Sequence, residues 1–168
     1  VARQLSYNVK DLLGKDKKTP PFLLVLDTIQ DPGNLGTMMR AGEAAGVTGI
    51  LMNQETVDMY NPKVIRSTMG ALYRVPFLYT EDLSGTLKEL KKQGICLYAA
   101  HLKGTRDYDS SPCAFLIGNE ANGLSEEIAS LADVYVKIPM CGSVESLNAA
   151  IAAAVLAFEG ARQRRMKL

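Results

Sequence analysis

Short apolar runs alternate along this chain with segments in which apolar residues recur at helical spacing. Most of the runs lack polar alternation and are bounded by glycine, proline or polar residues, which is typical of buried strands. Residues 82–93 instead place Leu83, Leu87 and Leu90 on one helical face before Gly94. The pattern predicts strands at residues 22–26, 49–52, 75–79, 95–100, 114–117 and 134–138, and helices at 35–45, 62–71, 82–93, 125–131 and 146–165.

The order of these predicted elements indicates the fold class. Strands that alternate with helices and are apolar on both faces are typical of a parallel sheet covered on both sides. The sequence therefore predicts a three-layer α/β fold with a mostly parallel sheet. Residues 21–168 are expected to form this domain, and residues 1–20 a basic lead-in that is loosely ordered over residues 1–19.

The net charge is close to neutral, but the charged residues are unevenly distributed. The 168 residues are 47% hydrophobic and 22% charged, with a formal net charge of +1. This balance excludes a uniformly basic nucleic-acid-binding protein and an acidic disordered chain. Residues 1–20 carry a net charge of +3 and residues 162–168 of +4, whereas residues 21–161 carry −6. The basic ends are expected either to attract a polyanion or to be solvated tails.

Missing patterns disfavour several classes of site. Cys96, Cys113 and Cys141 form no CxxC pair, which disfavours a disulfide framework or a zinc site and predicts an intracellular, cytoplasmic protein. The longest apolar run, residues 149–158, is too short to cross a bilayer. Neither a GxxxxGK(S/T) phosphate loop nor a GxGxxG dinucleotide fingerprint occurs, so an ATP site or a nicotinamide-dependent oxidoreductase is disfavoured.

Three loops rich in glycine and polar residues follow predicted strands and should open at the carboxyl edge of the sheet, where ligands of such folds bind. Asn34, Glu120, Ser146 and Asn148 supply polar groups there. Arg40 follows Asn34 by six residues on a predicted helix, so its long side chain can point back toward the loop. Taken singly, Asn34 can also be a turn residue, Ser146 a helix cap and Arg40 a surface ion pair. The loops span residues 27–40, 117–124 and 138–148.

These loops resemble the three motifs of the SpoU (TrmH-like) family of RNA ribose 2′-O-methyltransferases, within the SPOUT superfamily. The matching segments are DPGNLGTMMRAGEAAG at residues 31–46, LIGNEANGL at 116–124 and IPMCGSVESLN at 138–148. The resemblance covers residues 21–163, and three motifs in the right order and spacing make it specific.

The resemblance implies a fold, a cofactor and a mode of assembly. The C-terminal part of the α/β domain would be threaded into a trefoil knot, which periodicity cannot show because knots are very rare. The protein would be a homodimer joined through the C-terminal helix region, with no metal and no membrane partner. It would bind S-adenosyl-L-methionine (AdoMet), and the contacts carried over, largely through backbone groups, are Ala100, Gly118, Ile138, Met140 and Leu147.

The catalytic residues that the resemblance implies are Arg40, Asn34, Glu120, Ser146 and Asn148. A ribose 2′-OH is a poor nucleophile until its proton leaves, and the arginine of this family is often assigned as the base. Because a guanidinium stays protonated at neutral pH, our hypothesis is that Arg40 binds a substrate phosphate and stabilises the developing alkoxide. His101 is disfavoured as the base because it adjoins the expected adenine pocket, and Cys141 is interpreted as a small buried side chain.

The sequence therefore predicts AdoMet-dependent methyl transfer to a ribose 2′-OH of structured RNA, with 23S rRNA preferred. Because the first residue is Val and only residues 1–21 precede the first predicted strand, an N-terminal RNA-binding domain is expected to have been removed. The alternatives are a tRNA 2′-O-methyltransferase and a catalytically silent RNA-binding or ribosome-assembly module of the same fold. The near-neutral charge predicts weak, salt-sensitive RNA binding by these residues.

Overall fold

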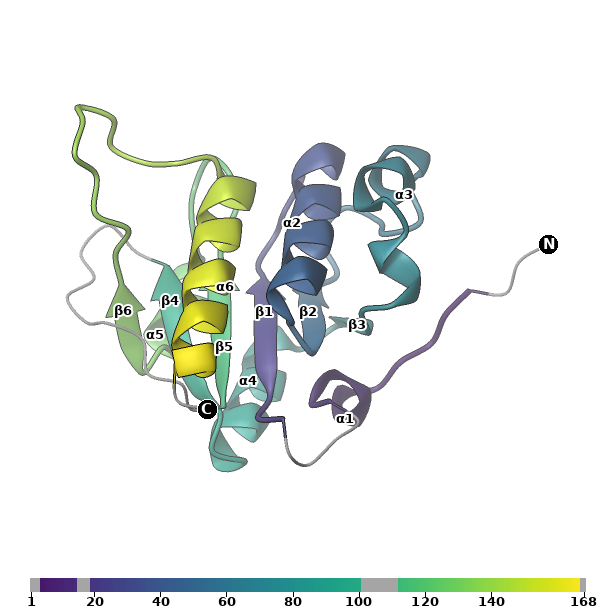
Figure 1. The fold of residues 1–168 in the computed structure, drawn as a ribbon. Coiled ribbons are helices and arrows are strands. Elements are labelled where there is room, and N and C mark those ends of the chain that lie inside the picture. The colour runs from purple at the N-terminus through teal and green to yellow at the C-terminus, as the bar shows by residue number, and fades with distance from the viewer. Residues whose placement is uncertain (1–3, 15–18, 101–111, 167–168) are drawn as a thin grey trace.

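A six-stranded parallel sheet with helices on both of its faces forms the centre of the molecule (Figure 1). The computed structural model describes residues 4–14, 19–100 and 112–166. The strands are β1 (Phe22–Leu26), β2 (Gly49–Asn53), β3 (Phe77–Thr80), β4 (Cys96–Ala100), β5 (Cys113–Ile117) and β6 (Val134–Val136). Their order is β3-β2-β1-β5-β4-β6, and every paired neighbour is parallel. The predicted three-layer α/β fold is confirmed, and the C-terminal knot stays a prediction.

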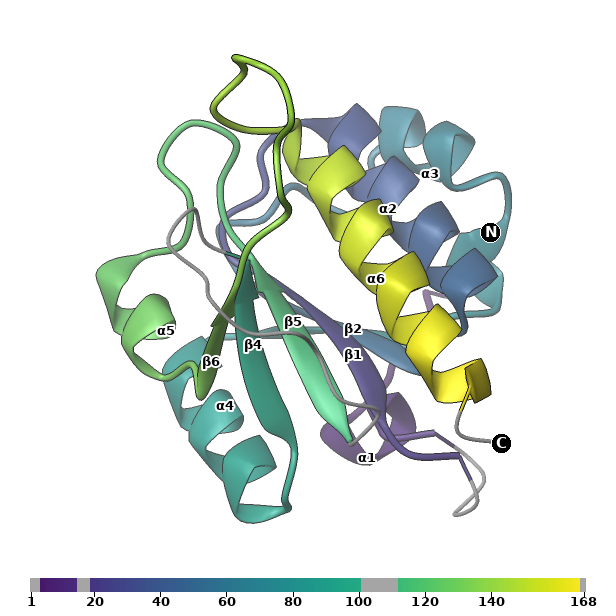
Figure 2. The same ribbon diagram turned by 60° about the vertical axis from the view of Figure 1, so that its left-hand side comes forward.

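Helices form the two outer layers (Figure 2). They are α1 (Val9–Leu12), α2 (Pro32–Ala45), α3 (Pro62–Thr68), α4 (Leu83–Lys92), α5 (Glu126–Ser130) and α6 (Ala149–Met166), with a short 3₁₀ helix, η1 (Ala71–Tyr73). Buried side chains of α2, α3 and α6 belong to the core on one face of the sheet, and those of α1, α4 and α5 to the core on the other face. In the part of the chain that the structure describes, none of the helices has the length and apolar character needed to span a membrane.

The central strand β1 shows why the strands are continuous apolar runs. Phe22, Leu24 and Leu26 point into the core beneath α2 and α6, whereas Leu23 and Val25 point into the core beneath α4. All five side chains are buried. Because both faces of β1 are covered, neither set of alternate residues can be polar without an unsatisfied group in the core.

The ends of several elements differ from the predicted ones. α2 begins at Pro32 rather than at residue 35, because the Asp31 side chain accepts a hydrogen bond from the Asn34 backbone N–H at 2.8 Å and caps the helix. α3 ends at Thr68 rather than at residue 71, and β3 begins at Phe77 rather than at residue 75, since η1 lies between them.

The C-terminal helix α6 begins at Ala149 rather than at residue 146. The Asn148 side chain accepts hydrogen bonds from the backbone N–H groups of Ala150 at 2.9 Å and Ile151 at 3.3 Å. Asn148 therefore caps the helix, and the alternative that Ser146 is only a helix cap is wrong.

Residues 4–14 pack against the sheet. Leu12 is fully buried, and a Cβ added to Gly49 of β2 would lie 2.6 Å from the Leu12 Cα, so α1 and β2 are in direct contact. The backbone N–H of Leu5 donates to the Tyr60 hydroxyl at 2.8 Å. The expectation of a loosely ordered lead-in is therefore wrong for these residues. A single helical turn with one buried leucine has no repeating pattern that the sequence could reveal.

Replacing Leu12 by alanine is expected to lower the free energy of unfolding by about 2–5 kcal/mol, because the change leaves a cavity between α1 and β2. Urea-induced unfolding measures the loss, and Lys10→Ala on the exposed side of the same turn is the matched control. A Leu12→Ala variant as stable as the Lys10→Ala variant would show that α1 does not belong to the folded domain.

The arrangement of the strands creates a ligand-binding edge. Strands β2 and β3 follow β1 on one side, whereas β5, β4 and β6 lie on the other, so the chain direction across the sheet switches between β1 and β5. Ligands of open α/β sheets bind beyond the carboxyl ends of the strands at such a switch point. The segment 137–148, which follows β6, rises above this edge and returns over it to α6 (Figures 1 and 2).

Candidate functional site

A pocket of about 380 Å³ lies at the carboxyl edge of the sheet. Its wall is formed by the end of β4, the loops after β5 and β6, and the first turn of α6. Glu120, Glu145 and Ser146 are among its polar lining residues. The five residues to which the sequence resemblance assigns AdoMet contacts all line it: Ala100, Gly118, Ile138, Met140 and Leu147.

A chain of side-chain hydrogen bonds joins the three loops. The Asn148 side-chain amide donates to Asn34 Oδ1 at 3.0 Å, and the Asn34 amide donates to Glu120 Oε1 at 2.9 Å. Asn34 lies in the first turn of α2, Glu120 follows β5 and Asn148 caps α6, so each residue comes from a different part of the chain. We call this chain of three residues the Asn–Asn–Glu relay. The structure thus brings together three of the five predicted catalytic residues.

The Glu120 carboxylate is the acidic end of the relay. Its oxygens also accept hydrogen bonds from the backbone N–H groups of Asp31 at 3.1 Å and Gln30 at 3.2 Å. Burial raises the pKa of Glu120, but the Asn34 side chain and several backbone N–H groups donate to the carboxylate and lower the pKa below its ordinary value. Glu120 is therefore ionised at neutral pH and holds the Asn34 amide in one orientation.

Gly118 allows the loop after β5 to fold back tightly on itself. The backbone groups of Asn119 and Gly123 exchange two hydrogen bonds of 2.9 Å, which closes the loop. A Cβ built on Gly118 would overlap the backbone of Gly123 and Leu124. Any other residue at this position must therefore displace the loop that lines the pocket.

Asp27, a residue that the sequence pattern did not single out, ties this loop to the end of β1. Asp27 is 4% exposed, and its carboxylate accepts hydrogen bonds from the Ser125 backbone N–H at 2.9 Å and the Ser125 hydroxyl at 2.7 Å. The Asn53 side-chain amide, at the end of β2, donates to the other oxygen at 3.0 Å. The only sign of Asp27 in the sequence was its position, as a single carboxylate directly after five apolar residues that form a buried strand.

Among the described residues, neither Arg40 nor Ser146 makes a hydrogen bond with the relay. Arg40 is exposed on α2, and within the described residues it makes no hydrogen bond or ion pair with the loops. Ser146 and Glu145 line the pocket, and His101 lies outside the described residues.

Cys141 is exposed, so its interpretation as a buried side chain is wrong: the loop that carries it rises above the sheet, where no layer covers it. No cluster of metal-ligating side chains occurs within the described ranges.

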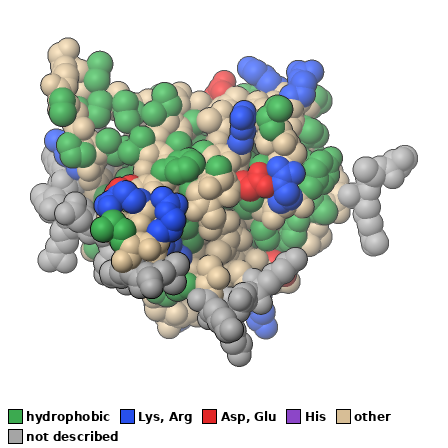
Figure 3. Space-filling view, in the orientation of Figure 1, with side chains coloured by type: hydrophobic (Ala, Val, Ile, Leu, Met, Phe, Trp, Pro, Cys, Tyr) green, Lys and Arg blue, Asp and Glu red, His purple; other side chains and the backbone are tan. Residues whose placement is uncertain are grey.

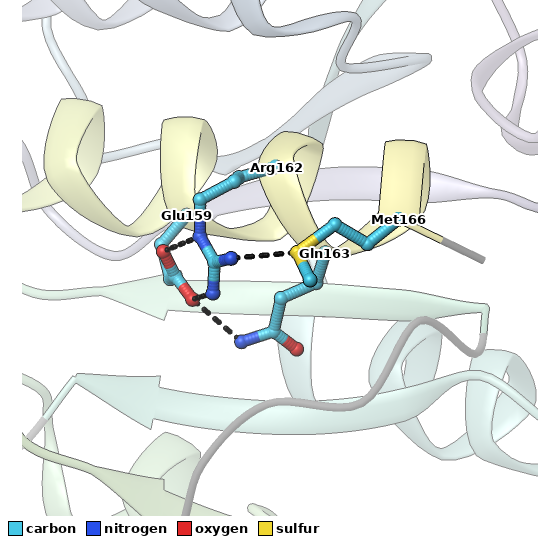
Figure 4. A network of polar contacts seen from close by, with 4 residues as sticks. All are labelled: Glu159, Arg162, Gln163 and Met166. Atoms are coloured by element: carbon cyan, nitrogen blue, oxygen red, sulfur yellow. Dashed lines mark hydrogen bonds and ion pairs between the residues drawn. The ribbon is translucent and has the colours of Figure 1, made fainter. Parts of the chain in front are cut away.

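Two arginines near the C-terminus, Arg162 and Arg164, make contacts within the chain. Arg162 donates two hydrogen bonds to the Glu159 carboxylate at 2.7 and 2.8 Å (Figure 4). The Arg164 guanidinium donates to the carbonyl oxygens of Pro20 at 2.8 Å and Pro21 at 2.9 Å, and lies 4.5 Å from the centre of the Phe22 ring. Two of the basic side chains that the sequence analysis considered for RNA attraction therefore already bind partners within the chain.

The Glu159–Arg162 pair should be visible in a pH titration. Hydrogen bonds from Arg162 and Gln163 lower the pKa of Glu159 to about 2. A lowered pKa in the folded state stabilises the fold above the ordinary carboxyl pKa, and this contribution is lost as the pH falls toward 2. In carboxyl carbon NMR titrations, Arg162→Gln should move the Glu159 pKa back toward its ordinary value, whereas Lys88→Gln on α4 should leave it in place. An ordinary Glu159 pKa in the unmodified chain would contradict the pair.

Comparison with known proteins places the chain in a family. The profile of the SpoU rRNA Methylase family matches residues 21–158. The 23S rRNA (guanosine-2′-O-)-methyltransferase RlmB of Vibrio parahaemolyticus is 36% identical over 169 residues, which cover 98% of this chain and 68% of that protein. The 23S rRNA (guanosine(2553)-2′-O)-methyltransferase RlmP of Bacillus subtilis is 35% identical over 140 residues, covering 81% of this chain and 56% of that protein.

A solved structure from the same family is also similar to this chain. The SpoU methyltransferase AviRb from Streptomyces viridochromogenes, in complex with the cofactor AdoMet, has a TM-score of 0.82 and 31% identity. The match covers 91% of this chain and 66% of that one, so the chain spans between 56% and 68% of these three proteins. The family profile includes the loops after β1, β5 and β6, which the relay joins. The chain therefore belongs to the SpoU rRNA Methylase family.

Proposed function

We propose that this chain is the catalytic domain of an AdoMet-dependent RNA methyltransferase that methylates a ribose 2′-OH of rRNA. One observation carries the proposal: the loops after β5 and β6 line a single pocket, and the Asn–Asn–Glu relay joins the loop after β1 to both of them. A fold retained only for binding RNA would not need both the pocket and the relay. The catalytically silent module is therefore the less supported alternative.

The residues of the pocket fit AdoMet. Ile138, Met140 and Leu147 offer apolar side chains, and the tight turn at Gly118 exposes backbone groups that can hydrogen-bond a purine edge. The carboxylates of Glu120 and Glu145 suit the positive charge of a sulfonium. When bound, AdoMet would supply an electrophilic methyl group to the ribose 2′ oxygen and leave as S-adenosylhomocysteine, and the 2′-OH proton would pass to the neighbouring substrate phosphate.

The protein's part of the reaction is to hold the acceptor and stabilise the charge that develops on it. The relay fixes the Asn34 side chain, which is then available to orient the ribose. Arg40, whose guanidinium has no acidic partner among the described residues, binds the phosphate next to the acceptor and stabilises the developing alkoxide. Ser146, on the loop above the pocket, contacts the target nucleotide.

Assembly as a homodimer is part of the proposal. Ile151, Val155 and Phe158 lie on one face of α6 and are 52%, 41% and 47% exposed. Hydrophobic side chains are visible at the surface over α6 (Figure 3). An apolar helix face of this kind is favourable only if a partner covers it.

The substrate preference follows the relatives RlmB and RlmP, which are both named for 23S rRNA. The test is methyl transfer from radiolabelled AdoMet to purified 23S rRNA and to bulk tRNA, followed by mapping of ribose methylation in cells with and without the gene. A lost 2′-O-methyl in 23S rRNA is the expected result. A lost methyl in tRNA would reassign the substrate, and no AdoMet binding by calorimetry at about millimolar ligand would favour the silent module.

A further inference from the structure

Two large side chains project from the surface beyond α3. Met69 is 69% exposed and Tyr73 is 68% exposed. Met69 has a φ of 50°, in the left-handed region that favours glycine, so the turn presents a bulky side chain at a position where a glycine would cost less. Tyr73 offers a ring that makes no hydrogen bond within the described residues.

Basic residues surround these two side chains. Lys63 and Arg66 are exposed on α3, and neither has an acidic partner in the part of the chain that the structure describes. The neighbouring Arg74 differs, because it is bound by Glu43. Figure 3 shows Lys and Arg side chains gathered on this side of the molecule, over α2 and α3.

Packing of α2 against α3 places Arg40 beside this group. Gly36, one turn before Arg40, lies against Ser67 of α3. Glu43, nearly one turn after Arg40, binds Arg74 just past η1. Because residues three and four apart share a helix face, Arg40 faces the same segment. We call the set of Arg40, Lys63, Arg66, Met69 and Tyr73 the α3 surface.

We infer that the α3 surface binds single-stranded RNA next to the target nucleotide. Unpaired cations attract phosphates, and an exposed aromatic ring stacks on an unpaired base, a combination typical of single-strand binding. Duplex RNA offers no free base face to Tyr73. A protein partner is less favoured, because no acidic side chain in the set balances the three cations.

The α3 surface is continuous with the catalytic site. α2 carries Asn34 of the relay at one end and Arg40 six residues later, about 9 Å along the helix axis. A strand bound across the α3 surface therefore reaches the relay within a short stretch of chain. This inference rests on the proposed function for the identity of the RNA, but the binding it describes does not require methyl transfer.

The test measures the binding of a fluorescein-labelled single-stranded RNA of about 12 nucleotides to the full chain, by anisotropy at several salt concentrations. Tyr73→Ala should weaken binding at least about fivefold with an unchanged salt dependence, and Tyr73→Phe should bind like the parent. Lys63→Gln combined with Arg66→Gln should reduce the slope of log K against log salt concentration by about 1.4. Lys88→Gln, on the opposite face, is the control for a lost cation.

Calorimetry with AdoMet on each variant separates this inference from the proposed function. Intact AdoMet binding with the expected losses of RNA affinity supports both. Absence of AdoMet binding and methyl transfer, with the same losses, overturns only the proposed function. Unchanged RNA affinity and salt slope in the Tyr73 and Lys63/Arg66 variants, no RNA binding by the parent at low salt, or a change of oligomeric state in the variants would overturn the inference.

Discussion

Replacing Arg40 by alanine is expected to lower the rate of methyl transfer by about 10²–10³-fold, the range found when one preorganised donor to a developing oxyanion is removed. The AdoMet affinity should stay unchanged, because Arg40 does not line the pocket. Stability should also be retained, since the side chain is exposed and makes no hydrogen bond within the described residues. Single-turnover methyl transfer to 23S rRNA measures the rate, and calorimetry measures the AdoMet affinity.

Arg40→Lys separates the two roles that an arginine can play here. A phosphate-binding and alkoxide-stabilising Arg40 predicts partial activity in the lysine variant and no new ionisation in the pH profile, because a lysine only partly reproduces the planar guanidinium contact. A true base predicts a rate that rises with pH up to the lysine's own pKa. Near-complete activity with such a pH dependence would contradict electrostatic stabilisation.

Replacing Gly118 by alanine is expected to weaken AdoMet binding by at least about tenfold and to lower the free energy of unfolding by about 1–3 kcal/mol. The added Cβ overlaps the backbone of Gly123 and Leu124, so the loop after β5 must move. This loop lines the pocket and also holds Glu120 in the relay. One methyl group therefore disturbs both the pocket and the relay.

Gly142→Ala is the matched control for this prediction. A Cβ at Gly142 meets nothing within 4 Å, and Gly142 lies in the loop after β6 without lining the pocket. Calorimetry should give it the parent's AdoMet affinity, and urea unfolding the parent's stability. A Gly118→Ala variant that binds AdoMet as tightly as Gly142→Ala would show that the closed loop is not required for the pocket.

The local pattern of apolar and polar residues was sufficient to predict the sheet and the positions of the three loops. Each strand is a short apolar run because both faces of the sheet are covered, and that signal needs no knowledge of distant residues. The residues assigned to the AdoMet pocket through the motifs do line one pocket. Their roles in binding and catalysis stay proposals.

The sequence by itself could not show which polar side chains meet. Asn34 lies 86 residues from Glu120 and 114 from Asn148, and they touch only because β1 and β5 are neighbours and the segment after β6 returns over the sheet edge. For the same reason the net charge did not show which basic side chains can bind RNA. Arg162 and Arg164 bind partners within the chain, whereas Lys63 and Arg66 have no acidic partner among the described residues.

Element types and motif positions were thus determined by the sequence, because neighbouring residues share a local backbone pattern. The relay, the burial of α1, the exposure of Cys141 and the α3 surface were decided by tertiary structure. Hydrogen bonds and ion pairs act over a few ångströms, so they depend on which distant segments the strand order brings together.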